Sequence, residues 1–203
     1  VSTPPGGAGC SPNFGTPQAL IDNMDVIDPQ TPGLGLYEQP GIIYFTADLT
    51  APGNSFILIR GGLDDDVGSP ELYDADYDAL KGYDLILQGG WSGVNGDTNF
   101  TQTDFGANPV QIGTDTNPWA GNLTVKDITV NGVTTGTGLT VYTQGNINLD
   151  NVTANDNAGD GADLDNCIDA GAGCTGNGDV SVIDSNFDGN NKSLNPADAG
   201  SGL

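Results

Sequence analysis

Aspartates gather in a few loops of this chain, and such a density of carboxylate oxygens suits a metal ion. Two groups lie within residues 63–84, and a third lies within residues 156–169. Hard oxygen ligands in a flexible loop favour Ca²⁺, and binding would neutralise the repulsion among them. None of the groups is an EF-hand, because the Gly and the final Glu of that loop are missing. The candidate calcium ligands are Asp64, Asp65, Asp66, Asp74, Asp76, Asp78, Asp160, Asp163 and Asp165.

The acidity of the whole chain leaves two alternatives to calcium open. The 203 residues hold 27 Asp and Glu against 4 Lys and Arg, a formal net charge of -23. A solvated acidic face or a halophilic origin would give the same balance. A surface of this sign repels phosphate, so we expect neither nucleic-acid binding nor attachment to anionic lipid. No stretch approaches the roughly 20 apolar residues of a membrane helix, and no membrane insertion is expected.

Two of the three cysteines lie close together in the sequence. Six residues stand between Cys167 and Cys174, and we predict a surface loop closed by a disulfide between them. Structural zinc would need four ligands, and the chain has no histidine. Three roles stay open for Cys10: a buried thiol, a crosslink to another subunit, or a lipid-modified residue. A start at Val1 without Met is consistent with a cleaved signal peptide, so secretion is expected.

A motif that returns three times indicates which elements carry these residues. GNLTVKDITVNG begins at Gly121, GNINLDNVTAND at Gly145 and GDVSVIDSNFDG at Gly178. The alternation of apolar residues predicts short half-buried strands, one coil of a stacked solenoid per copy. Three apolar columns align: Leu123, Ile147 and Val180; Val125, Leu149 and Val182; and Val130, Ala154 and Phe187.

Two polar columns separate these strands. The first contains Asp127, Asn151 and Asp184, and the second contains Asn131, Asn155 and Asp188. Asn and Asp tolerate the left-handed backbone conformation and bond to nearby amides, which predicts corners between strands. A repeated metal ladder is the alternative. A second strand column runs through residues 138–141 and 161–164 and restarts at 202–203, so an unpaired edge is expected there.

The remaining chain predicts one helix and four further strands. Thr16 is a helix N-cap with Pro17 at the first helical position, and an apolar stripe follows to residue 27. We expect this helix to cover the open lower end of the stack. Strands are expected at 42–45, 56–59, 85–87 and 110–112. The predicted division is an extended segment with a capping helix, 1–40, and a β-helix, 41–203, whose last coil is incomplete.

The segments TPQALID, GIIYFTADLT and DLILQGGWSG, followed by the Gly-Asn repeats, carry a family resemblance. From Thr16 to Leu203 the chain resembles secreted right-handed parallel β-helix proteins of the pectin-lyase-like superfamily, in particular repeat-bearing adhesins and structural proteins of the bacterial surface. The resemblance implies an all-β right-handed parallel β-helix with a short N-terminal capping helix and long surface loops. Because that superfamily holds lyases, glycosidases, adhesins and structural proteins, it implies no activity.

Catalytic residues are not expected. A lyase resembling the pectate lyases needs an Arg or Lys base beside calcium-binding carboxylates, and the coils carry only Lys126. A glycosidase needs two carboxylates at a set separation. Asp163 and Asp165 could form such a pair, but Asp is so common here that chance pairs are expected.

The leading prediction is a non-catalytic extracellular structural or adhesive protein of a surface filament or sheath. Its expected partner is a second copy, joined head to tail through the ends of the β-helix, or the cell surface and its matrix. The alternative is a protein that binds or cleaves polysaccharide, with aromatic rings beside carboxylates in a groove. The candidates for that role are Trp91, Trp119 and Tyr142, for which packing is the simpler explanation.

Overall fold

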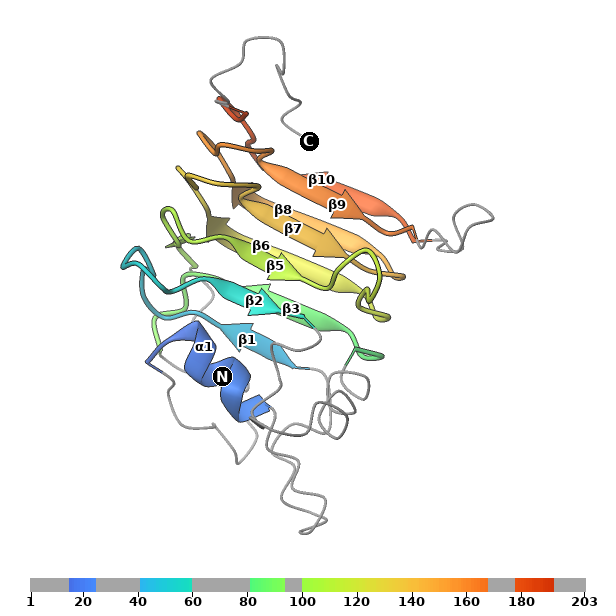
Figure 1. Ribbon diagram of the computed structural model, residues 1–203. Coiled ribbons are helices and arrows are strands. Elements are labelled where there is room, and N and C mark those ends of the chain that lie inside the picture. Colours follow the sequence, from blue (N-terminus) through green and yellow to red (C-terminus); the bar gives the residue numbers. More distant parts are fainter. Residues whose placement is uncertain (1–14, 25–40, 60–80, 94–99, 168–177, 192–203) are drawn as a thin grey trace, which may run out of the picture.

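The regular structure in the described part of the chain is almost entirely parallel β-sheet, and the all-β prediction is confirmed. The computed structural model describes residues 15–24, 41–59, 81–93, 100–167 and 178–191. In this part of the chain every strand pair is parallel, and one short helix accompanies the strands (Figure 1).

The strands form two sheets, and the chain passes repeatedly from one to the other. The larger sheet contains β1 (Ile42–Tyr44), β3 (Leu85–Gln88), β4 (Thr103–Asp104), β6 (Leu123–Thr129), β8 (Ile147–Thr153) and β10 (Val180–Ile183). Its order is β1-β3-β6-β8-β10, with β4 beside β6. The smaller sheet, in the order β2-β5-β7-β9, contains β2 (Phe56–Leu58), β5 (Val110–Ile112), β7 (Leu139–Tyr142) and β9 (Ala162–Asp165).

The apolar columns of the repeat are confirmed as strand register. Ile147 pairs with Leu123 on one side and with Val180 on the other. Leu149 stands in the same way between Val125 and Val182. The residues of β6 and β8 in these columns are buried, whereas Val180 and Val182 are exposed by 46% and 38%. The expectation of a half-buried strand is therefore wrong for β10.

The two polar columns differ from each other. Asp127, Asn151 and Asp184 have φ angles of 53°, 55° and 49°, which confirms the left-handed corners. In the described chain, residues of the second column have no positive φ, so that part of the prediction is wrong for them. They form a ladder between rungs instead, because the Asn155 amide donates to Asn131 Oδ1 at 2.7 Å and the Asp188 amide to Asn155 Oδ1 at 2.6 Å.

The first glycine of each copy is explained by close stacking of the backbone. A Cβ on Gly145 would lie 2.6 Å from the carbonyl oxygen of Gly121, and one on Gly178 would lie closer still to that of Gly145. Real Cβ atoms do not approach a carbonyl so closely, so a side chain here would force two rungs apart.

The predicted helix is confirmed as α1 (Pro17–Met24). Thr16 Oγ1 accepts a hydrogen bond from the Ala19 amide at 3.1 Å, as an N-cap should. Leu20 and Ile21 are buried in the core, and the helix packs against β2 at the β1 end of the sheets (Figure 1).

Candidate functional site

The larger sheet is interrupted at one corner. In β6 and β8 a single left-handed residue, Asp127 or Asn151, joins the two halves of the strand. In the rung below, β3 pairs with the first half of β6 and β4 with the second half, so that Gln88 lies opposite Lys126 and Thr103 opposite Ile128. The segment between the two strands, residues 89–102, takes the place of the one corner residue. We call its described parts, residues 89–93 and 100–102, the insertion corner.

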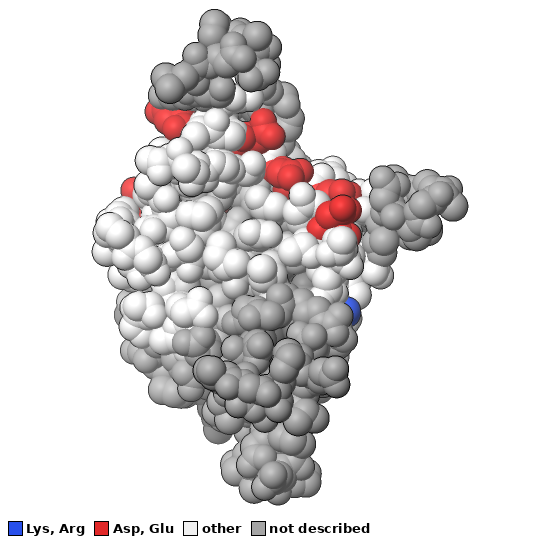
Figure 2. All heavy atoms as spheres, viewed as in Figure 1, with Lys and Arg blue, Asp and Glu red and all other residues white. Residues whose placement is uncertain are grey.

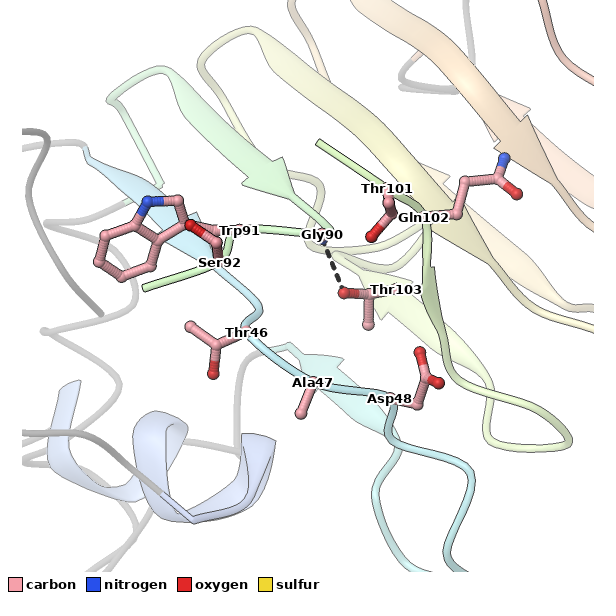
Figure 3. Close-up of a pocket in the computed structure, with 9 residues that line it drawn as sticks. All are labelled: Thr46, Ala47, Asp48, Gly90, Trp91, Ser92, Thr101, Gln102 and Thr103. Atoms are coloured by element: carbon pink, nitrogen blue, oxygen red, sulfur yellow. Dashed lines mark hydrogen bonds between the residues drawn. The ribbon is translucent and has the colours of Figure 1, made fainter. Parts of the chain in front are cut away.

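Backbone hydrogen bonds hold the start of the insertion corner. The Gly89 amide donates to the Lys126 carbonyl at 2.9 Å, and the Trp91 amide donates to the Phe45 carbonyl at 3.0 Å. The Gly90 amide donates to Thr103 Oγ1 at 2.8 Å (Figure 3). Gly90 has a φ of 68°, and a Cβ there would overlap the Thr101 carbonyl oxygen. Both ends of the segment are thus closely packed together.

The end of the insertion corner is held by the Gln102 side chain. Its Nε2 donates to the Asn151 carbonyl at 2.8 Å, and its Oε1 accepts from Thr129 Oγ1 at 2.8 Å. In Figure 3 this side chain points away from Thr103, towards β8. Gln102 therefore ties the segment to the two rungs above it.

A cavity of about 230 Å³ lies where the insertion corner meets the segment after β1. It is open to solvent and is lined by residues 46–48, 90–92 and 101–103 (Figure 3). The lining offers hydroxyl groups from Thr and Ser, one indole and one carboxylate, and none of the described lining residues is Lys or Arg. Asp48 is held in place, because its Oδ1 accepts from the Asp104 amide at 3.0 Å. The chemistry of the lining suits a small ligand that is rich in hydroxyl groups.

Aromatic rings stand beside this cavity. The Trp91 and Tyr44 ring centroids are 5.1 Å apart at 42°, and those of Tyr44 and Phe100 are 6.5 Å apart at 18°. Burial raises the pKa of the Tyr44 hydroxyl above its ordinary value of 10.0. Sequence reasoning found Trp91 but missed Tyr44 and Phe100. Nothing in the sequence signals that β1 and the insertion corner meet.

The other two predicted carbohydrate-binding residues lie outside the cavity lining. Trp119 is 2% exposed, and its indole N–H donates to the Tyr83 carbonyl at 2.6 Å, so little of its ring can meet a ligand. Tyr142 is half-buried on β7, and its hydroxyl donates to Asp163 Oδ2 at 3.1 Å. Burial, then the hydrogen bond and charge of Asp163, raise the pKa of Tyr142.

The described acidic residues do not converge on a point. On the face shown in Figure 2, the visible acidic residues lie over the C-terminal rungs, in the upper part of the picture. Asp163 accepts from Tyr142, and Asp165 Oδ1 accepts from the Cys167 amide at 2.7 Å. Across the described ranges, no three Asp, Glu, His or Cys residues are grouped so as to hold a metal ion. Asp64, Asp65, Asp66, Asp74, Asp76 and Asp78 lie outside the described residues, so the calcium site stays a prediction.

Two further sequence predictions can be located. Cys174 lies outside the described residues, so its disulfide with Cys167 stays a prediction. Lys126 Nζ lies 2.8 Å from Asp150 Oδ2, and both side chains are more than a third exposed. An exposed pair of this kind adds little stability. No helix in the described part of the chain is long and apolar enough to cross a membrane.

In comparisons with known proteins, no family model, curated protein or solved structure matched this chain. The function is therefore argued from its own residues.

Proposed function

We propose that this chain is a non-catalytic extracellular structural or adhesive protein and that its copies join head to tail through the ends of the sheets. In this proposal the two sheets are faces of a right-handed parallel β-helix. Support comes from strands that alternate between the sheets along the chain and from ladder contacts spaced 24 and then 33 residues apart. A rigid stack of this kind is a suitable subunit for a filament or sheath.

The observation that carries the proposal is the exposure of two apolar residues of β10. Val180 and Val182 are exposed by 46% and 38%. They stand in columns whose members on β6 and β8 are no more than 1% exposed. No described strand pairs with the outer edge of β10. Such an edge offers backbone groups and apolar side chains to a further strand.

The proposed occupant is β1 of a second copy. β1 is the other terminal strand of the same sheet, and no described strand pairs with its outer edge. The helix α1 also lies at this end, where it packs against β2 of the smaller sheet. Ile43 lies opposite Leu87, and that position continues through Val125 and Leu149 to Val182. Parallel pairing of β10 with β1 of the next copy would therefore continue this apolar column. Because the two surfaces differ and the contact need not close, it would generate a filament.

Sedimentation velocity over a range of protein concentrations, with electron microscopy of the same samples, tests the proposal. The wild-type chain should form concentration-dependent linear assemblies. Val182→Lys should abolish them, because a charge would enter the apolar column at the edge. Ser181→Lys is the matched control: it adds the same charge to the same strand, at a position that alternates to the other face, and assembly should persist.

Two results would contradict assembly through β10. One is a wild-type chain that stays monomeric at every concentration. The other is a Val182→Lys variant that assembles as the wild type does. Circular dichroism of each variant shows whether it is folded, so that a loss of assembly is not confused with unfolding.

A further inference from the structure

We infer that the cavity at the insertion corner is a binding site for one neutral sugar unit of a saccharide, stacked at Trp91. This inference names the class of ligand that the proposed adhesive protein would bind, and it does not depend on assembly through β10. The first argument is that the cavity is built into the fold. At the equivalent corners of the next two rungs one residue suffices, whereas here β3 and β4, on either side of the insertion corner, pair in register with the two halves of β6.

The second argument is that contacts within the protein hold the walls of the cavity. Thr103 is 1% exposed, accepts from the Gly90 amide at 2.8 Å and donates to the Phe45 carbonyl at 3.4 Å. Asp48 is held by the Asp104 amide. Trp91 rests against Tyr44, which limits the positions that its indole can take. A preformed site loses less entropy when the ligand binds.

The third argument is the chemistry and size of the lining. Hydroxyl groups such as those of Thr46, Ser92 and Thr101 both donate and accept, which matches the hydroxyl groups of a sugar. An indole offers an apolar face with one polar edge, to which the C–H face of a pyranose ring can stack. A volume of about 230 Å³ is below the usual range for drug-sized ligands, which agrees with a single sugar unit.

The negative charge of the protein distinguishes neutral from acidic saccharides. The lining contains the carboxylate of Asp48 and no described cation, and the chain carries a formal net charge of -23. A uronate would be repelled, so the ligand is a neutral sugar. A quaternary ammonium group beside Trp91 and Asp48 is the competing ligand, because an aromatic ring and a carboxylate both attract a cation.

Amide chemical shifts of the ¹⁵N-labelled full chain provide the test. If the wild type assembles, the measurement is made on the Val182→Lys variant. The probes are the hexaoses of glucose, xylose, mannose and galactose, hexagalacturonate and choline, each at low-millimolar concentration. At least one neutral hexaose should shift the amides of 90–92 and 101–103, and hexagalacturonate should not.

Variants establish the role of the indole. Trp91→Ala should weaken the binding of that hexaose at least about fivefold, and Trp91→Phe, which keeps an aromatic ring, should weaken it less. Tyr83→Ala is the matched control, because Tyr83 is an exposed aromatic residue that does not line the cavity, and its affinity should equal that of the wild type. The inference is overturned if no neutral hexaose shifts these amides. It is also overturned if choline shifts them and the sugars do not, or if Trp91→Ala leaves the affinity unchanged.

Discussion

The corner between the halves of β6 and the insertion corner occupy the same place in neighbouring rungs and are built in opposite ways. At the first, Asp127 alone turns the chain, with its side chain accepting from Gln88 Nε2 and from Asn151 Nδ2, both at 2.6 Å. At the second, a longer segment joins β3 to β4, and its residues 90–92 and 101–102 line a cavity. A stack of parallel strands can therefore lengthen one corner without disturbing its core, because the pairing on both sides stays in register.

The same comparison separates stability from binding. The Asp127 corner links three rungs by side-chain hydrogen bonds, since Gln88 precedes it and Asn151 follows it in the stack. Thr103 and Gln102 make similar hydrogen bonds at the insertion corner, but there the bonded residues line the cavity. We therefore expect substitutions at the Asp127 corner to change only the stability of the fold. Substitutions at the insertion corner should change either stability or ligand affinity, depending on the residue.

The largest effect is expected from Gly90→Ala. Gly90 and Gly93 both have positive φ, so an alanine at either costs about 1–2 kcal/mol. At Gly90 the new Cβ would also overlap the Thr101 carbonyl oxygen, which should add about 1–3 kcal/mol. No described atom lies within 4 Å of the Cβ position at Gly93, so Gly93→Ala is the control. Urea unfolding of both variants measures the difference, and equal stabilities would show that the ends of the insertion corner can separate freely.

A smaller effect is expected at the single-residue corner, from Asp127→Ala and Asp127→Gly. Both variants lose the acceptors for Gln88 and Asn151, which should cost about 1.5–3 kcal/mol. Alanine must also adopt a φ near 53°, so it should be less stable than glycine by about 1 kcal/mol. Thermal unfolding of the two variants gives the comparison. If alanine proves the more stable, the left-handed backbone is not what selects Asp at this corner.

The smallest effect concerns Tyr44 beside the insertion corner. Burial raises its pKa above 10.0, so the folded state favours the neutral phenol. This contribution to stability is fully present below pH 10 and is lost as the pH rises through the pKa of the folded state. Trp91→Ala uncovers the Tyr44 ring and should move its pKa back towards 10.0. Titration of tyrosinate absorbance, with Tyr44→Phe to assign the signal, checks this, and an unchanged curve would mean that the indole does not shield Tyr44.

Much of the fold could be predicted from the sequence because each strand carries its own signal. Short apolar segments identified β1, β2, β3 and β5, and the three repeat copies predicted the register of β6, β8 and β10. Thr16 and Pro17 predicted the start of α1. β4 was missed, because Thr103 and Asp104 show no alternation and become a strand only by pairing with β6.

The candidate site was only partly predictable. Trp91, Trp119 and Tyr142 were candidates because they are aromatic. The residue type alone does not tell whether an aromatic ring lies beside a cavity or in the core. Trp119 is buried under the Tyr83 carbonyl, and Tyr142 bonds to Asp163. The cavity itself joins segments around positions 47, 91 and 102, which no local pattern relates.

The sequence by itself determined most of the strands, the register of the repeat and the left-handed corners at Asp127, Asn151 and Asp184. It could do so because hydrophobic periodicity and the backbone preference of Asp and Asn act within one rung or between similar rungs. Only the tertiary structure decided that Trp91 meets Tyr44, that residues 46–48, 90–92 and 101–103 line a cavity, and that Val180 and Val182 are exposed while their counterparts are buried. These properties depend on which segments become neighbours when the rungs stack, and a residue's exposure depends on whether another rung covers it.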